Sequence, residues 1–262
     1  MTGFGYNVNG FGAYYDREVT VTASNASSVN LQTIFNNALP NSWISTIVKR
    51  YVIPSDVVLG ITTVPASMAG TLIIDNSGDI QGTGGSGGSG NFAGNLPYTY
   101  SEQPAALAGD AGGAGGTAMT VQSTGVTINM LSGSTLSGGG GGGGGGGQGG
   151  NGRFLGGGNL QYAPGGAGGD AGQGIGYNQS QANGSAGGGV SHENAGSGGT
   201  GGNGATGFGA AGSTGSNGNN GNWTNGASGG AGGAAGRAIT FSGVSAYTII
   251  GTDSGTINGA YT

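Results

Sequence analysis

The sequence predicts a two-part fold, in which a small α+β or β-rich domain carries a sandwich of packed antiparallel polyglycine-II helices with connecting loops. Three observations predict it. Glycine accounts for 70 of the 262 residues. Gly138–Gly147 is an unbroken run of glycine, and glycine then returns at every third position in later stretches, as at Gly209, Gly212 and Gly215. Residues 1–81, in contrast, have an ordinary globular composition.

The three-residue glycine period indicates an extended helix with a bare stripe, against which a neighbouring backbone can lie closely. Such a helix has no internal hydrogen bonds, so its amides and carbonyls can bond laterally to other helices. Collagen shares the period but needs proline-rich positions between the glycines. This chain has six prolines, and none lies inside a glycine tract. A flexible linker would need no period at all.

Residues 1–81 are predicted to form the small domain. Apolar residues at helical spacing predict a short amphipathic helix, capped by Asn or Ser before Val29 and ended by Pro40. That stripe consists of Leu31, Ile34, Phe35, Ala38 and Leu39. Strands are predicted at 18–22, 47–53, 57–64 and 71–74. The strand-like insert 117–137 and the C-terminal strands in 237–262 are expected to complete the same sheet.

The glycine-rich domain is predicted to comprise 82–116 and 138–236. Its tracts fall at 82–90, 109–116, 138–152, 165–174, 184–189, 196–204, 209–218 and 226–236. Each of these two glycine-rich segments must leave the small domain and return to it, so successive tracts are expected to pair into hairpins. This count places 91–108, 153–164, 190–195 and 219–225 at the far tips, and 175–183 and 205–208 at the near side.

Composition excludes several classes of function. The net charge is -5 and the cations are few and scattered, which argues against nucleic acid as the main partner. With no cysteine, neither disulfides nor a Cys-rich metal site can form. Neither a secretory signal nor a long apolar span is visible, so we expect a soluble protein made in a cytoplasm. No cofactor and no metal are expected.

Catalytic patterns are present but weak. Gly84–Gly88 and Gly226–Gly230 match a nucleophile elbow, which needs a strand–turn–helix context and a histidine partner, and such matches arise by chance in glycine-serine tracts. Asp110 and Asp170 are the candidate acid pair for glycoside hydrolysis, although solvated tract ends explain them better. His192 with Glu193 would make a weak metal site. We therefore predict that the chain is not an enzyme.

The breaks between tracts hold the side chains suited to binding. Aromatic and arginine residues dominate binding hot spots, whereas Ser, Gly and Asn supply adaptable polar contacts. Between Gly138 and Gly236 every aromatic residue lies in a break, as do Arg153, His192 and Glu193. The breaks thus have the composition of binding loops on a rigid scaffold. The simpler alternative is that these aromatics only cover the ends of the slab.

At this point a resemblance is apparent. The most telling strings are Gly138–Gly147, GGAGGDAG at 165–172 and GASGGAGGAAG at 226–236. Over essentially its whole length the chain resembles the tip adhesins of the long tail fibres of T-even-type bacteriophages. In that family an N-terminal attachment domain precedes glycine-rich motifs that alternate with hypervariable segments.

The resemblance implies a phage protein that caps a trimeric distal tail-fibre protein and binds an outer-membrane protein of a Gram-negative host. It implies a place at the fibre tip in the virion, with synthesis in the host cytoplasm and no insertion into a membrane. The implied recognition loops are 91–108, 153–163, 175–183, 190–195 and 219–225. The family pattern would therefore place 175–183 at the tip, whereas the tract count places it at the near side, and both remain open.

From the breaks and the resemblance together, the candidate receptor-binding residues are Phe92, Leu96, Tyr98, Tyr100, Arg153, Phe154, Leu155, Tyr162, Tyr177, Asn178, His192, Glu193, Asn222 and Trp223. The candidate fibre-attachment residues are Phe4, Tyr6, Phe11, Tyr14, Tyr15 and Trp43, although a small domain could need the same aromatics for its core. A structural or ice-binding glycine-rich protein is the main alternative. It predicts flat faces of small residues and leaves the long aromatic segment 91–108 unexplained.

Overall fold

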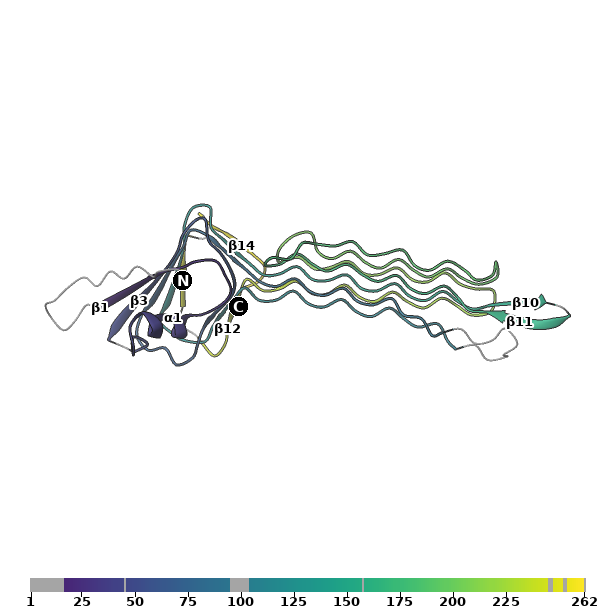
Figure 1. The fold of residues 1–262 in the computed structure, drawn as a ribbon, viewed down its shortest axis with the longest axis horizontal. Coiled ribbons are helices and arrows are strands. Elements are labelled where there is room, and N and C mark those ends of the chain that lie inside the picture. Colours follow the sequence, from purple (N-terminus) through teal and green to yellow (C-terminus); the bar gives the residue numbers. More distant parts are fainter. Residues whose placement is uncertain are drawn as a thin grey trace. The chain divides into compact units, whose positions relative to one another are not determined.

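The computed structural model of the chain describes residues 17–44, 46–94, 104–156, 158–244, 247–251 and 254–261. They fall into two compact units. Unit 1 comprises the described residues up to 83 together with 117–138 and those from 237 onward, and unit 2 comprises those of 84–116 and 139–236. The described chain is mostly strand and extended backbone and contains one α-helix (Figure 1).

Unit 1 is a parallel solenoid in which the chain alternates between two sheets. The first sheet holds β1 (Arg17–Thr22), β3 (Ile47–Ile53), β5 (Leu72–Asn76), β8 (Val126–Met130) and β13 (Tyr247–Ile250), in that order. The second holds β2 (Ala26–Asn30), β4 (Val58–Val64), β6 (Asp79–Gln81), β7 (Met119–Val121), β9 (Thr135–Ser137), β12 (Ile239–Phe241) and β14 (Thr256–Asn258). Every strand pair within these two sheets is parallel. The single expected sheet is thus two sheets.

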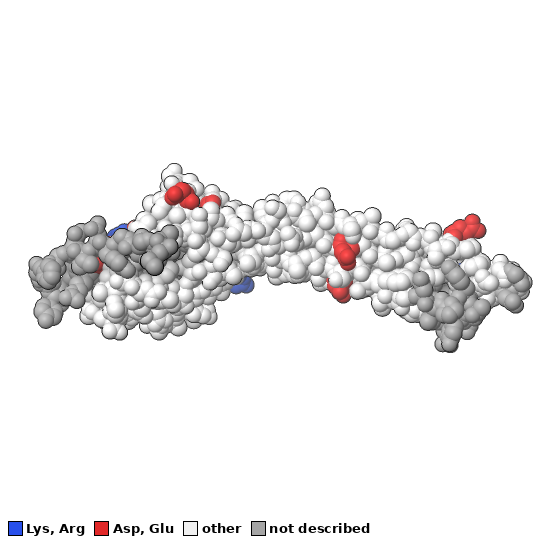
Figure 2. All heavy atoms as spheres, in the orientation of Figure 1, with Lys and Arg blue, Asp and Glu red and all other residues white. Residues whose placement is uncertain are grey.

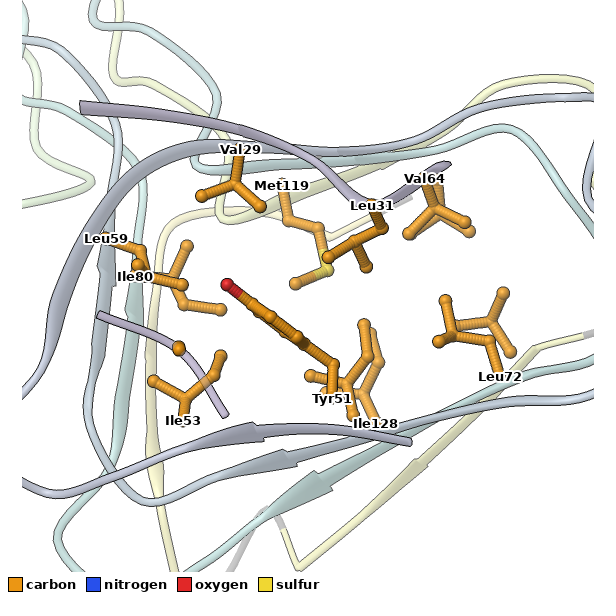
Figure 3. Close-up of a cluster of buried hydrophobic side chains, with 14 of the residues drawn as sticks. Val29, Leu31, Tyr51, Ile53, Leu59, Val64, Leu72, Ile80, Met119 and Ile128 are labelled. Atoms are coloured by element: carbon orange, nitrogen blue, oxygen red, sulfur yellow. The ribbon is translucent and has the colours of Figure 1, made fainter. Parts of the chain in front are cut away.

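The core of unit 1 lies between the two sheets. Alternate residues of each strand point inward, which is why β3 reads as alternately buried and half-exposed. The parallel register stacks Tyr51, Ile74 and Ile128 in one column across three successive strands. Figure 3 shows Tyr51 and Ile128 in the same apolar cluster, with Leu59 of the second sheet.

Helix α1 (Leu31–Ala38) closes the core at the first turn. The Asn30 side chain accepts a hydrogen bond from the Thr33 N–H at 3.2 Å, so the cap is Asn30 itself and not a residue before Val29. The helix stops at Leu39, immediately before Pro40, as predicted. Leu31 and Phe35 are wholly buried, and the helix packs against β1, β2 and β4.

The two glycine-rich excursions leave the solenoid at equivalent points. One runs between β6 and β7, and the other between β9 and β12. In β4 the same two positions are joined directly, because its residues 58–59 pair with β6 and its residues 62–64 pair with β7. The excursions therefore interrupt one strand in each of two successive turns, at the level of residues 60–61 of β4, and the strands on either side keep their register.

Unit 2 is built from eight tracts that form neither α-helix nor β-strand and run side by side (Figure 1). We number them in chain order: tract 1 (84–90), tract 2 (109–116), tract 3 (139–150), tract 4 (165–175), tract 5 (182–188), tract 6 (196–205), tract 7 (210–221) and tract 8 (226–236). Tract 3 lies at the centre. Its N–H groups at 139, 140 and 141 donate to tracts 2, 4 and 7, and the same order repeats at 142, 143 and 144.

The carbonyls of tract 3 complete the ring of neighbours. Those at 139, 140 and 141 accept from tracts 8, 1 and 6, so tract 3 has a hydrogen-bonded partner in six directions. The registers show that odd-numbered tracts run one way and even-numbered tracts the other, which agrees with the alternation expected from the tract count. All of tract 3 is buried.

This central position explains the uninterrupted glycine run. A Cβ added at Gly142 would lie 1.9 Å from the carbonyl oxygen of Ser86, and one at Gly143 would lie 2.1 Å from that of Gly202. At Gly144 the clash would be with the carbonyl oxygen of Gly230, at 2.0 Å. Every face of tract 3 meets a backbone, whereas an outer tract can place a side chain on its solvent face.

Candidate functional site

Four connections lie together at one end of unit 2. Gly149 and Gly150 of tract 3 are bonded to Gly166, Gly196 and Asn219, and Gln148 is bonded to Leu107. The described parts of the connections between tracts 1 and 2, 3 and 4, 5 and 6, and 7 and 8 therefore share that end. We call it the far end. The opposite end, at which residues 84, 116, 139 and 236 lie, is the entry end.

The connection between tracts 3 and 4 is an antiparallel hairpin of β10 (Gly152–Gly156) and β11 (Asn159–Ala163). Gly158 has φ +83°, a left-handed conformation that favours glycine at the turn. Leu155 and Leu160 are directly opposed in the register, and the Leu155 side chain is 78% exposed. The hairpin therefore presents apolar side chains to solvent.

Buried amide side chains fasten the connections to the tracts. Gln148 Oε1 accepts the N–H groups of Ala93 at 2.9 Å and Leu107 at 3.1 Å. Asn151 donates through Nδ2 to the Pro104 carbonyl at 2.8 Å, and its Oδ1 accepts the Gly165 N–H at 3.1 Å. Both side chains are almost wholly buried. They replace backbone partners at the point where the regular tract ladder stops.

The hairpin is also tied to the other two far-end connections. Asn222 accepts the Arg153 N–H through Oδ1 at 2.7 Å and donates to the Arg153 carbonyl through Nδ2 at 2.8 Å. Asn194 donates to the same carbonyl at 3.4 Å. Thr224 Oγ1 accepts the Asn151 N–H at 2.7 Å. These bonds give the far end a fixed backbone.

Two aromatic pairs cross between connections. The rings of Phe154 and His192 stack at 3.8 Å between centroids with planes 7° apart. Tyr162 and Trp223 pack at 4.6 Å with a 53° angle between planes. Tyr162 is buried, while Phe154, His192 and Trp223 are half-buried. The buried member acts as a support, and the others keep part of their surface accessible.

Sequence reasoning missed some exposed apolar side chains at this end. Phe92 and Leu155 were among the candidates, but Leu107, Leu160 and Val190 are also strongly exposed there. The signal that could have found Leu160 is its alternation with Asn159 and Gln161 after a glycine pair, which is typical of a hairpin strand. Leu107 and Val190 lie inside the predicted loops 91–108 and 190–195, but no local pattern distinguishes them from their neighbours there.

Other candidates lie elsewhere. Tyr177 and Asn178 form a tight turn closed by a bridge between Gly176 and Gln179, and Ile175 is bonded to Gly140, so this turn lies at the entry end. Trp43 is buried in unit 1 and packs on Phe35 with ring centroids 6.1 Å apart. The candidates Leu96, Tyr98, Tyr100, Phe4, Tyr6, Phe11, Tyr14 and Tyr15 lie outside the described residues.

Charge is sparse on the described surface, as the face in Figure 2 illustrates. At the far end the exposed charged residues described are Arg153 and Glu193. Asp170 Oδ1 accepts the Gly90 N–H at 2.9 Å, and Asp110 Oδ1 accepts from Asn91 at 3.1 Å, so both acids hold the end of tract 1. Within the described ranges, no group of three His, Asp or Glu side chains is placed to hold a metal ion.

One comparison with known proteins shows the family of this chain. The model of the family described as "Phage tail fibre adhesin Gp38" matches residues 16–262. The chain is also similar to a chain of a solved structure, titled "Crystal structure of the gp37-gp38 adhesin tip complex of the bacteriophage S16 long tail fiber". That similarity has a TM-score of 0.46 at 19% identity and covers 94% of this chain and 82% of that one. The family assignment depends on the family model. No curated protein sequence matches the chain, and no helix in the described ranges is long and apolar enough to cross a membrane.

Proposed function

Because this chain belongs to the Gp38 family of phage tail fibre adhesins, we propose that it binds a host receptor through the far end of unit 2. One observation supports this site above the others. In the described part of unit 2, the large hydrophobic side chains that are strongly exposed are Phe92, Leu107, Leu155, Leu160 and Val190, and all of them lie at the far end. Apolar side chains gathered on an exposed surface mark an interaction site.

The proposed scaffold is a sandwich of antiparallel polyglycine-II helices. Support comes from the three-residue repeat of hydrogen-bond direction along tract 3, which is the repeat of a helix with three residues per turn. The scaffold is held by backbone groups, so the side chains of the connections are free to serve binding. Asn151, Asn194 and Asn222 then fix the backbone of those connections before a receptor arrives, which lowers the entropic cost of binding.

The proposed receptor is an outer-membrane protein of a Gram-negative host. Its contacts would be the apolar side chains of the hairpin, the exposed parts of Phe154, His192 and Trp223, and the charges of Arg153 and Glu193. Leu96, Tyr98 and Tyr100 are proposed contacts from the segment between tracts 1 and 2. Tyr177 and Asn178 are left out of the proposed site because they lie at the entry end.

We further propose that the protein binds without catalysing a reaction and that unit 1 holds it on the distal tail-fibre protein. The chain would be made in the host cytoplasm and carried at the fibre tip. Phe4, Tyr6, Phe11, Tyr14 and Tyr15 remain proposed contributors to fibre attachment. Trp43 is not retained there, because its side chain belongs to the core.

The test is binding of the fluorescently labelled chain to a panel of Gram-negative cells. The variant Leu155→Ser with Leu160→Ser removes exposed apolar surface without touching the buried supports. We expect its affinity for a permissive strain to fall at least about tenfold, as for interface hot spots. Leu131→Ser in unit 1, also strongly exposed, is the matched control and should bind like the unchanged protein.

Tyr177→Ala supplies a second control, since it removes an aromatic side chain from the entry end. Equal loss of binding in Tyr177→Ala and in the hairpin variant would contradict the far-end site. Binding that depends on neither variant would contradict the proposal as well. Circular dichroism of each variant shows whether the fold is intact.

A further inference from the structure

We propose that the last turn of unit 1, formed by β13, β14 and residues 260–261, is the surface that receives strands of the tail-fibre protein. This inference rests on the proposed function, which supplies the fibre as partner. β13 is the final strand of the first sheet and pairs on one side with β8. β14 is likewise final in the second sheet and pairs with β9. Among the described residues, no further strand pairs with β13 or β14, so each leaves the backbone groups of one edge unpaired in that part of the chain.

The columns of stacked inward-facing side chains in the first sheet end at this turn. The column of Leu72 and Val126 continues to Tyr247, and that of Ile74 and Ile128 continues to Ile249. Val126 is 1% exposed, whereas Tyr247 at the equivalent inward position is 39% exposed. An inward-facing side chain at that exposure indicates that the next layer of a continuous core is missing.

The two ends of unit 1 are treated differently. At the first turn α1 covers the core, with Leu31 and Phe35 wholly buried. Among the described residues, no corresponding helix covers the last turn. There the Phe241 and Tyr247 rings stack at 3.5 Å with planes 8° apart and only partly cover the core. Solenoids need a cap at each end for solubility, and the described residues supply none at the last turn.

The chemistry of the last turn selects the occupant. Ile250 and Tyr261 are each more than half exposed, and the described residues 238–244, 247–251 and 254–261 include no charged side chain. A neutral, apolar partner that offers strands fits this surface, because main-chain bonds to the free edges would add to apolar contact. Both sheets are parallel throughout, and a strand from another protein can continue them. A second copy of this chain related by a twofold axis would meet β13 antiparallel to itself.

The test measures binding to the purified distal tail-fibre protein of the same phage. The variant Ile250→Lys with Tyr261→Lys places two charges on the last turn at exposed positions, and circular dichroism checks that the variant is folded. We expect its affinity for the fibre protein to fall at least about tenfold, because the charges must be desolvated on docking. The matched control is Ile61→Lys with Leu131→Lys, two exposed apolar residues elsewhere in unit 1, and its affinity should stay within about twofold.

Binding of the same proteins to host cells separates the two proposals. The last-turn variant should bind cells as the unchanged chain does, because the far end of unit 2 is intact. Fibre binding equal to that of the unchanged chain would overturn this inference and leave the proposed function standing. If the unchanged chain does not bind the fibre protein, the proposed attachment fails and this inference with it. A concentration-dependent dimer in sedimentation that the last-turn variant abolishes would reassign the surface to a second copy.

Discussion

Unit 1 and unit 2 use side chains in opposite ways. In unit 1 the strands are held apart by inward side chains such as Tyr51, Ile74 and Ile128, and burial of those side chains stabilises the fold. In unit 2 the tracts approach until backbone meets backbone, and a Cβ added at any residue from Gly141 to Gly147 would overlap a neighbouring carbonyl oxygen. Unit 1 is therefore destabilised when a core side chain is removed, and unit 2 is destabilised when a side chain is added to its central tract.

The difference separates stability from recognition. In a core of packed side chains, a substitution that alters binding can also alter the fold. In unit 2 the lateral backbone bonds do not depend on the identity of the far-end side chains, apart from supports such as Gln148 and Asn151. The connections can therefore change sequence while the tracts keep their register, which suits a surface that selects a receptor.

The largest effect is expected from adding a methyl group to the centre of unit 2. In Gly145→Ala the new Cβ would lie 1.9 Å from the Ser89 carbonyl oxygen, which belongs to a backbone held on other sides by hydrogen bonds. We expect a loss of at least about 4 kcal/mol of unfolding free energy, beyond the usual range for a point substitution. Hydrogen exchange of the tract amides would report it directly.

Gly189→Ala is the matched control for that change, because nothing lies within 4 Å of the added Cβ. Its stability should be unchanged or higher by about 0.4–1 kcal/mol, since alanine restricts the unfolded chain. Equal protection of the tract amides in both variants would show that the tracts are not packed backbone against backbone.

The complementary change removes a side chain from unit 1. Ile128→Ala leaves a cavity in a wholly buried column and should cost about 3 kcal/mol. Thermal unfolding followed by the near-ultraviolet signal of the unit 1 aromatics should show the lower midpoint, while protection of the unit 2 amides changes less. A variant as stable as the parent would mean that this column is not a packed core.

A smaller effect is expected at Lys49, which is wholly buried and donates from Nζ to the carbonyls of Ile44, Ile47 and Ala69, each at 2.8 Å. Lys49→Met should cost about 1–3 kcal/mol at neutral pH because these acceptors lose their donor. Burial lowers the pKa of Lys49 from its ordinary value of 10.5, so between the folded-state pKa and 10.5 the unfolded chain binds the proton more tightly.

The stability of the unchanged protein should therefore rise relative to Lys49→Met as the pH increases through that window. Tyr51 acts in the opposite direction above about pH 10, because burial raises the pKa of its hydroxyl, but it is present in both proteins and cancels in the difference. Chemical denaturation at a series of pH values would measure the difference in unfolding free energy between the two proteins. A difference that decreases as the pH rises would contradict a lowered pKa of Lys49.

The smallest effect is expected at the outer face of the first sheet. Arg50 pairs with Glu18 at 2.9 Å and with Asp75 at 2.5 Å, and the group is partly exposed. These partners raise the pKa of Arg50 chiefly through the Asp75 hydrogen bond, yet solvent screens such pairs. Arg50→Met should cost less than about 1 kcal/mol in urea denaturation, and the cost should shrink in high salt. A loss as large as that of Ile128→Ala would show that the ion pairs, and not the core, hold the sheet.

Local patterns predicted much of this molecule. The stripe from Leu31 to Leu39 predicted α1, and period-two alternation predicted β3 and several of its neighbours, because these signals arise from residues close together in sequence. The short strands β2, β6 and β9 and the hairpin of β10 and β11 were not predicted. Each of these strands has five residues or fewer, so its sequence contains too few alternating residues for a period of two to be recognised.

The pairing of the strands could not be predicted from such local sequence patterns. The expected single sheet is a two-sheet parallel solenoid, because parallel partners come from distant parts of the chain and strands such as β8 and β13 carry no mark of each other. The far-end residues Leu107 and Val190 were missed for a related reason. Their exposure depends on which tracts end beside them, and not on their own neighbours in sequence.

The sequence by itself predicted that tracts alternate in direction, because a chain that leaves the small domain must return, although it left open at which end of unit 2 residues 175–183 lie. It also determined that the tracts could touch, since only glycine permits backbone contact at every third position. The tertiary structure alone decided that tract 3 lies at the centre, that Tyr177 and Asn178 lie at the entry end, and that Trp43 and Tyr162 are buried. Whether a residue lies at the centre of unit 2, at one of its ends or in a buried core depends on how the whole chain packs. These properties arise only when segments distant in sequence pack around the residue.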